Sequence, residues 1–331
     1  MTPVISVIVC TYNQEQTISR TLDSILAQKC QVPIEIIIGE DCSTDGTLPI
    51  CKAYADANPD TIRLLQNERN KGLIDNYYDC LLACKGKYIA ECAGDDYWID
   101  DYKLAKALQL IESNPEISLV HTDWQYFNCQ TNETFPSGNE AKNISITDGK
   151  KLLEDILTPL SRPTIHLCTA LYRKDLIIKS YNENTYLFRN KDFGCEDIQV
   201  CFMAALNGKI GYIPDITLSY SIGKPSISSA PDDKKQFDFV KKTTSLSVYL
   251  ADLYQCRTPK VENYIEKKLF ALSMHAFRSH SAQLRAEVCL LVKKWHASMP
   301  MKAKVVQAIA KYSWSWNAAL IFRKCLLKLK K

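Results

Sequence analysis

The sequence lacks the long apolar segments of a membrane-spanning protein. No stretch of its 331 residues approaches the ~18 apolar residues that a helix needs to cross a bilayer. The apolar run Val4–Cys10 is short and has no basic leader, so it does not match a secretory signal peptide. We therefore expect a cytoplasmic protein.

Paired cysteine motifs are also missing. The 14 cysteines are scattered, and no C-x-x-C pair occurs among them. Several fall where a buried strand or helix face is expected, and an unpaired cysteine behaves as a small buried hydrophobe. These are Cys10, Cys51, Cys80, Cys84 and Cys201. The pattern favours free thiols in a reducing compartment over a disulfide framework.

Two common glycine-rich phosphate-binding motifs are absent. No G-x-G-x-x-G follows the first expected strand, where the sequence is Thr11-Tyr12-Asn13, and no G-x-x-x-x-G-K-[ST] occurs anywhere. Both motifs place backbone N–H groups around phosphates. Their absence counts against a nicotinamide-dependent dehydrogenase and a P-loop kinase.

Acidic residues are absent from the end of the chain. None follows Glu287, whereas ten of the 41 Lys and Arg residues do, so the preceding part carries 31 basic against 37 acidic residues. Residues 301–331 mix cations with apolar residues and tryptophan. This pattern fits a basic amphipathic helix on a membrane surface, and equally a helical appendage packed on the catalytic domain. A nucleic-acid partner is not expected, because the body is acidic.

The first third of the chain alternates apolar, β-branched runs with helical periodicity. Such alternation predicts an α/β fold with a mostly parallel, doubly wound sheet. The expected strands are Val4–Cys10, Ile34–Ile38, Ile62–Gln66, Tyr88–Cys92 and Ile117–His121. The expected helices are Glu15–Gln28, a segment from Asp45-Gly46 through Ala57, Asn76–Cys84 and Asp101–Glu112.

The pattern is less regular from about Trp124. We expect helices at 148–157, 174–180 and 197–206, and short strands at Ile210–Ile213 and Ile216–Ser221. The Ser-, Pro- and Gly-rich stretch 223–233 indicates a loop or boundary, after which the pattern is helical. The predicted organisation is a domain at 1–225, with halves 1–123 and 124–225, and a helical region at 234–331.

Polar residues follow three of the expected strands. They are Thr11-Tyr12-Asn13, the segment Gly39–Thr47 and the segment Gly94–Trp98. Ligands of open parallel sheets bind at the carboxyl ends of the strands, so these residues should share one edge. Four acids would meet there: Glu40, Asp41, Asp95 and Asp96. Crowded carboxylates are costly without a cation, and hard oxygen ligands suit Mg²⁺ or Mn²⁺.

Helix capping is the structural alternative for these polar residues. For Ser43 and Asp45 it explains the sequence as well as function does, because Asp45-Gly46-Thr47 is good turn chemistry. Adjacent Asp95 and Asp96, followed by Tyr and Trp, are poor capping residues. The hypothesis of a functional site therefore depends mainly on this pair.

Three segments together resemble the inverting glycosyltransferases of family 2. They are ISVIVCTYNQEQTISRTLDSILAQ, IEIIIGEDCSTDGT and GKYIAECAGDDYW, in this order, and the resemblance covers about the first 220 residues. It implies the GT-A fold and, for matching positions, specific roles. Thr11, Tyr12, Glu15 and Asp41 would hold the nucleotide base and ribose. Asp95 and Asp96 would contact the metal ion and the ribose, and Glu196-Asp197 would supply the general base, Asp197.

The sequence departs from the family pattern in several places. Ala93 replaces the first acid of the usual D-x-D-D, and Tyr220–Gly223 contains neither the Arg nor the His that some members carry there. A late metal ligand or phosphate contact would then be missing, or would come from Lys224. His166, Arg162 and Trp98 are weaker candidates for the acceptor pocket, since a histidine beside a strand or an aromatic pair is often structural.

The resemblance implies transfer of a sugar, with inversion, from a UDP-linked or related nucleotide diphosphate sugar to a hydroxyl of a carbohydrate or lipid-linked acceptor. Surface polysaccharide or glycolipid synthesis, at the inner face of the membrane, would suit such an acceptor. Two alternatives stay open. One is a nucleotidyltransferase or sugar-phosphate enzyme, although Asn13–Arg20 lacks the usual Gly-rich basic loop. The other is a non-catalytic nucleotide-sugar-binding scaffold.

Overall fold

The computed structural model describes residues 2–159, 164–224, 232–312 and 315–318. The chain divides into two compact units. The first comprises Met1–Lys191 and Cys195–Lys224, and the second comprises Asp192–Gly194 and Pro225–Lys331. Within the described ranges, no helix combines the length and the apolarity that crossing a bilayer requires. The cysteines of these ranges are free thiols.

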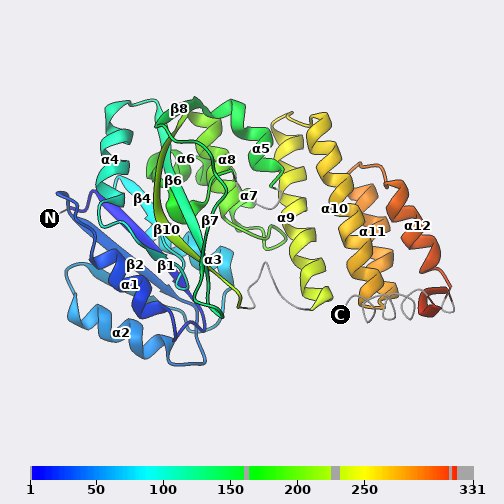
Figure 1. Ribbon diagram of the computed structural model, residues 1–331, viewed down its shortest axis with the longest axis horizontal. Helices are drawn as coiled ribbons and strands as arrows, with labels where there is room; N and C mark the ends of the chain where they lie inside the picture. Colours follow the sequence, from blue (N-terminus) through cyan, green and yellow to red (C-terminus); the bar gives the residue numbers. More distant parts are fainter. Residues whose placement is uncertain (1, 160–163, 225–231, 313–314, 319–331) are drawn as a thin grey trace. The chain divides into compact units, whose positions relative to one another are not determined.

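The first unit contains a ten-stranded sheet with the order β3-β2-β1-β4-β9-β6-β10-β5, to which β7 and β8 add at β6 and β10 (Figure 1). The strands are β1 (Ile5–Thr11), β2 (Ile34–Glu40), β3 (Ile62–Gln66), β4 (Tyr88–Glu91), β5 (Tyr97–Trp98), β6 (Ile117–Asn128), β7 (Thr134–Pro136), β8 (Ser145–Asp148), β9 (Leu171–Arg173) and β10 (Lys209–Ile222). The predicted α/β architecture is confirmed.

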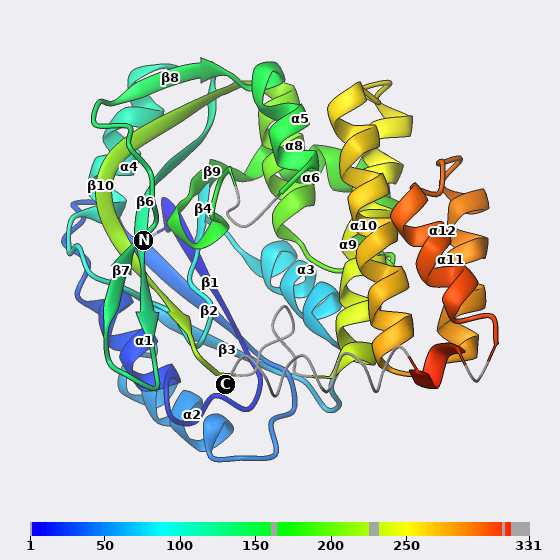
Figure 2. The same cartoon turned by 45° about the vertical axis from the view of Figure 1, so that its right-hand side comes forward.

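Helices cover both faces of this sheet (Figures 1 and 2). They are α1 (Ile18–Leu26), α2 (Thr47–Ala57), α3 (Leu73–Ala83), α4 (Lys103–Ser113), α5 (Leu153–Leu157), α6 (Lys174–Glu183), α7 (Thr185–Arg189) and α8 (Asp197–Asn207), with 3₁₀ turns η1 (Gly149–Leu152) and η2 (Leu167–Thr169). Alternate residues of β1, namely Ile5, Val7 and Val9, join the core formed with α1, α2 and α4. The opposite face packs against α3, so β1 is buried along nearly its whole length.

The sheet is mixed rather than uniformly parallel. Strands β3, β2, β1 and β4 pair in parallel, as do β6 and β10, but β9 lies antiparallel between β4 and β6. This three-residue strand follows η2 without a crossover helix. It is too short for a strand-like alternation of apolar and polar residues to predict it from the sequence. The expected strands 210–213 and 216–221 form one strand, β10, with a register shift between Ile213 and Ile216 where Pro214 lacks an N–H.

Two other boundaries also differ from the prediction. The expected strand at 117–121 continues to Asn128, because β10 pairs with it along its whole length. The expected helix at 148–157 is interrupted, since Asp148 ends β8 and a 3₁₀ turn precedes α5.

The second unit consists of helices, as the sequence predicts. They are α9 (Asp233–Leu253), α10 (Pro259–Arg278), α11 (Ala282–Lys294) and α12 (Met301–Ile309), and α10 packs against each of the other three (Figure 2). Side chains of Asp232, Thr258 and Ser281 cap α9, α10 and α11 by accepting hydrogen bonds from first-turn N–H groups.

Candidate active site

The loops after β1 and β2 are fastened to each other. The Glu15 N–H donates to Oδ2 of Asp45 (3.1 Å), and Oε2 of Glu15 accepts from the Gly46 N–H (2.6 Å). Asn13, which adopts a positive φ of 53°, donates from its N–H to Oγ of Ser43 (3.0 Å). One carboxylate oxygen of Glu15 therefore organises the strand-end loops, and its contact with a nucleotide stays a prediction.

Asp41 holds a third loop against this edge. Its side chain is 3% exposed, and it accepts hydrogen bonds from Nδ2 of Asn67 (2.9 Å) and from the N–H groups of Lys71 (2.8 Å) and Gly72 (2.8 Å). Three donors therefore hold this carboxylate in one orientation. Asp41 thus fixes residues 67–72, while its predicted contact with a nucleotide base stays a prediction.

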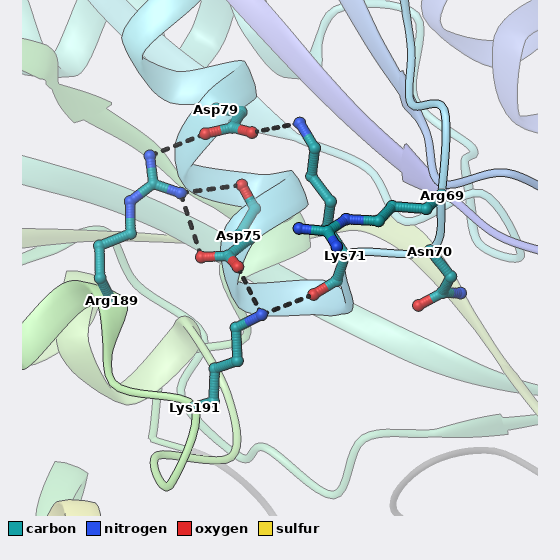
Figure 3. Close-up of a pocket in the computed structure, with 7 residues that line it drawn as sticks. All are labelled: Arg69, Asn70, Lys71, Asp75, Asp79, Arg189 and Lys191. Atoms are coloured by element: carbon teal, nitrogen blue, oxygen red, sulfur yellow. Dashed lines mark hydrogen bonds and ion pairs between the residues drawn. The ribbon is translucent and has the colours of Figure 1, made fainter.

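The same loop borders a pocket of about 470 Å³. Figure 3 shows Lys71 and Arg189 approaching Asp79 from opposite sides, each at 2.8 Å, with Lys191 bonded to Asp75 at 2.8 Å. These ion pairs join α3 to α7 and to the segment after it. They also brace the loop whose N–H groups bind Asp41.

The ends of β1 and β4 approach each other closely. A Cβ atom added at Gly94 would lie 2.9 Å from Oγ1 of Thr11 and 2.3 Å from Oε1 of Gln14, so a larger residue here would displace the Gln14 side chain and crowd Thr11. Thr11 is buried, and its hydroxyl has no hydrogen-bond partner among the described residues. Tyr12 follows with 45% of its surface exposed. Thr11 and Tyr12 are therefore beside the segment that carries Asp95 and Asp96.

Asp95 and Asp96 contact β10 on one side and α1 on the other through hydrogen bonds. Asp96 is 1% exposed, and its Oδ1 accepts from the Ser221 N–H at 2.8 Å. The Asp95 carbonyl oxygen accepts from Nη2 of Arg20 (3.1 Å) and from the Ser221 hydroxyl (2.5 Å). Arg20, which stacks 4.0 Å from the Tyr97 ring centroid, is a cation that our sequence reasoning did not place here.

Burial raises the pKa of both aspartates. For Asp96 the pKa lies well above its usual range, because desolvation disfavours the charge and neighbouring Asp95 adds repulsion. For Asp95 desolvation also dominates, against a smaller opposing effect of Arg20. Two desolvated hard-oxygen ligands fit Mg²⁺ or Mn²⁺, which would remove this repulsion. Asp95 is only partly buried, so its carboxylate is the more open of the two.

A second group of acids joins the end of β4 to the start of α8. Glu91, Glu196 and Asp197 each present a carboxylate oxygen, and these oxygens lie within 4.8 Å of one another. Glu91 and Glu196 are 7% and 8% exposed, whereas Asp197 reaches solvent. Desolvation raises the pKa of Glu196 to about 8, with repulsion from Asp197 second, and raises that of Asp197 to about 6.

Glu91 is a candidate functional residue that the sequence motifs do not indicate. The signal that could have found it is a carboxylate within the buried strand Tyr88–Glu91, a position where charge is rare unless it is paired or functional.

Aromatic residues lie near both acid groups. The pKa of Tyr220 is raised first by desolvation and then by the charges of Asp96, Asp95 and Asp197, so its hydroxyl lies within the influence of both groups. His166 packs its ring 4.7 Å from that of Tyr220 and 5.3 Å from that of Trp124. Burial lowers the pKa of His166 to about 4, so its imidazole is neutral at pH 7.

The other acceptor candidates differ in their positions. Trp98 is 4% exposed and belongs to the core, where its indole N–H donates to the Cys168 carbonyl oxygen (3.1 Å). This burial argues against direct contact with an acceptor. Arg162 lies outside the described residues. Lys224 donates from Nζ to Oε1 of Gln16 (3.1 Å), and its positive charge acts on Asp95, where it opposes the rise in pKa that desolvation causes.

Residues 6–181, more than half of the chain, match the family model described as glycosyl transferase family 2. An uncharacterised glycosyltransferase of Haemophilus influenzae is 28% identical over 255 residues, covering 75% of each chain. An uncharacterised protein of Mycobacterium tuberculosis is 40% identical over 114 residues, which span 34% of this chain and 33% of that relative. The chain thus spans about a third of the length of the mycobacterial relative.

A shorter match, 34% identical over 110 residues, covers 33% of this chain and 42% of WfaP from Escherichia coli. The name of that protein describes a glucosyltransferase from UDP-Glc to a GlcNAc-diphosphoundecaprenol.

Solved structures show the same fold at low identity. S. aureus TarS 1–349, in complex with UDP-GlcNAc, gives a TM-score of 0.54 at 19% identity, with 92% of this chain and 88% of that chain covered. The mannosyltransferase PcManGT from Pyrobaculum calidifontis, in complex with GDP-Man and Mn²⁺, gives a TM-score of 0.51 at 16% identity. The match covers 98% of this chain and 88% of that chain.

Proposed function

The chain belongs to glycosyl transferase family 2, and we therefore propose that it transfers a sugar from a nucleotide diphosphate sugar to an acceptor hydroxyl, with inversion. One observation carries this proposal. Asp95 and Asp96 form one acid group, Glu196 and Asp197 belong to a second, and Tyr220 lies within the influence of both. A glycosyltransferase needs two distinct acid groups. One group binds the metal ion that neutralises the leaving diphosphate, and the other receives the proton of the acceptor hydroxyl.

On the donor side, Asp95 and Asp96 would hold Mg²⁺ or Mn²⁺. The ion would supply neutralisation of the charge that develops on the leaving nucleotide diphosphate. Thr11 and Tyr12, at the end of β1, and Asp41 with its loop would surround the nucleotide. We propose a UDP-linked sugar, in keeping with the UDP-GlcNAc bound by TarS and the UDP-Glc in the name of WfaP.

On the acceptor side, Asp197 is the proposed general base. Its pKa of about 6 leaves it ionised at pH 7 but basic enough to accept a proton, and it reaches solvent at the start of α8. The acceptor hydroxyl loses its proton to Asp197 while its oxygen attacks the anomeric carbon. The bond to the diphosphate oxygen breaks on the opposite face, and the electron pair leaves with the nucleotide diphosphate.

Nucleotide binding tests the donor site directly. We expect UDP with Mn²⁺ to raise the melting temperature of the wild-type chain, since a ligand at a hundredfold excess over Kd stabilises the native state by about 2.7 kcal/mol. Differential scanning fluorimetry with UDP, dTDP, GDP and CDP, each with and without Mn²⁺, measures this. No shift with any of them would overturn the donor site. A metal-dependent shift without sugar transfer or donor hydrolysis would favour a non-catalytic scaffold, and pyrophosphorolysis would favour a nucleotidyltransferase.

A lipid-linked acceptor is our proposal for the second substrate, and the described part of 301–331 supports it. Met301, Val305, Ile309 and Tyr312 are exposed and recur at helical spacing along α12 and just beyond it, with exposed Lys302 and Lys304 nearby. A helix face that combines exposed apolar residues with nearby lysines suits binding to the surface of an anionic membrane. Trp316 does not contribute, because it is 5% exposed and donates from its indole N–H to the Phe277 carbonyl oxygen (3.0 Å). Residues 319–331 lie outside the described ranges.

Vesicle sedimentation tests this membrane contact. We expect Val305→Glu combined with Ile309→Glu to weaken binding to phosphatidylglycerol vesicles at least about tenfold, because two apolar contacts worth about 1.4 kcal/mol or more are replaced by repelled charges. Ile144→Glu is the control, since Ile144 is 61% exposed in the first unit. Equal binding by the double variant and the control would contradict the proposal.

A further inference from the structure

Glu91 is a buried acid that the mechanism above does not use. It ends β4, which pairs with β1 on one side and β9 on the other. Its Oε1 accepts a long hydrogen bond from Sγ of Cys168 (3.6 Å), while Oε2 is buried without a partner in the described part of the chain. Oε2 of Glu196 is equally buried and equally without a partner there. Two unsatisfied carboxylate oxygens beside a third acid call for an explanation.

The charges around Glu91 do not balance three carboxylates. Apart from desolvation, the groups that influence its pKa most are Glu196 before α8, Asp197 at the start of α8, Tyr77 from α3 and Cys168 from η2. One cation that interacts with Glu91 is Lys103 of α4, whose Nζ lies 4.2 Å from the Trp98 ring centroid and has no hydrogen-bond partner among the described residues. Burial lowers the pKa of Lys103 to about 8. Lys103 is still mostly protonated at pH 7, but its Nζ donates no hydrogen bond to the three acids in the described part of the chain, and a single cation does not balance them.

Three carboxylates within 4.8 Å cannot all be ionised in such surroundings, so protons are retained in the group. Exposure decides where they reside. Asp197 reaches solvent, whereas Glu91 and Glu196 are at least nine-tenths buried. The charge is least costly at the exposed end, and the proton is most stable at the buried end.

We infer that Glu91 is a positioning residue for the acceptor base: as a neutral carboxylic acid it donates a hydrogen bond within the Glu91–Glu196–Asp197 group and leaves the negative charge on Asp197. This inference rests on the proposed function, since it assigns the base role to Asp197. The directions of the pKa shifts agree with it. Desolvation raises the pKa of Glu91 well above its usual range, and repulsion from Glu196 and Asp197 raises it further.

Two variants of Glu91 separate this role from simple packing. Glu91→Gln keeps a neutral donor of the same shape, so we expect kcat within about threefold of wild type and an unchanged acid limb of the pH profile. Glu91→Leu keeps the volume but removes the donor. We expect it to lower kcat at least about tenfold and to move the acid limb upward by about one pH unit, because a lost hydrogen bond destabilises the ionised base.

The outcomes that would overturn the inference are specific. An acid limb that moves to lower pH in Glu91→Gln would mean that Glu91 is ionised in the wild type. If Glu91→Leu lowered kcat without moving the acid limb of the pH profile, the role of Glu91 would be packing alone. Nucleotide-dependent thermal shifts of both variants verify that the donor site still folds.

Infrared difference spectroscopy tests the protonation state without any turnover. Subtracting the Glu91→Gln spectrum from that of the wild type at pH 7 is expected to show the carbonyl stretch of a protonated carboxyl group. A carboxylate band instead would overturn the inference. If the wild type transfers no sugar but the protonated band is present, then the proposed function fails while the proton on Glu91 is established.

Discussion

Asp197→Asn is expected to lower sugar transfer by about 10²- to 10⁴-fold, the usual contribution of a positioned general base. The amide has nearly the same shape but cannot accept the acceptor proton. Wild-type activity should rise with pH through about 6, where Asp197 loses its proton, and the residual activity of the variant should lack this limb. Initial rates of nucleotide release, measured between pH 5 and 9 at saturating donor, test both statements.

Stability should change in the opposite direction to activity. The folded-state pKa of Asp197 is raised, so its ionised form destabilises the fold, and the cost appears as the pH rises through about 6. Asp197→Asn removes this cost, and the variant should melt at or above the wild-type temperature at pH 7. A charged group that is needed for function but lowers the stability of the folded protein is typical of active sites.

A matched control exists for the helix position of Asp197. Asp175 lies in the first turn of α6 and accepts from the Leu176 N–H, so it interacts with a helix N-terminus in the same way. Asp175→Asn is expected to leave transfer unchanged. If Asp197→Asn also retained activity within about threefold of wild type, Asp197 would be a helix-terminal acid only, and the base would have to be sought elsewhere.

Local sequence patterns were sufficient for most of the elements that build the edge of the sheet. The strand at Ile62–Gln66 agrees with the structure at both ends, because this short apolar run is bounded on each side by turn residues. The strand ends also carry the polar residues expected of them. What periodicity predicts is which residues are buried on one element and where that element stops.

Contacts between distant parts of the chain could not be predicted in this way. Ser221 binds Asp96 across 125 positions, and the register shift in β10 that precedes it leaves no pattern in the sequence. Lys103 begins an amphipathic helix, where a cation is expected to be solvated, yet it is fully buried over Trp98. Glu91 was treated as part of an apolar strand. In each case the tertiary environment, rather than local propensity, determines the role of the residue.

Asp96→Asn is expected to abolish the Mn²⁺-dependent part of nucleotide binding and to lower transfer at least about a hundredfold. The physical reason is that one of two desolvated anionic ligands becomes neutral, and the loss of about 2.7 kcal/mol of charge stabilisation corresponds to that factor. Thermal shifts with UDP, with and without Mn²⁺, and transfer rates on the same preparations provide the measurements. Asp101→Asn is the control, because Asp101 pairs with Lys29 in an exposed ion pair.

The stability of the ligand-free protein distinguishes a metal site from a structural acid. The pKa of Asp96 is raised well above its usual range by desolvation, so its ionised form costs stability, increasingly as the pH rises. Without metal, Asp96→Asn should therefore melt no lower than the wild type at pH 7, while the stabilisation by UDP and Mn²⁺ disappears. If Asp96 served only to bind the Ser221 N–H, the Oδ1 atom of the asparagine would still accept that hydrogen bond, and the variant would keep its metal-dependent shift. An acid whose replacement stabilises the free protein and removes the metal response is buried there for the cation that it binds.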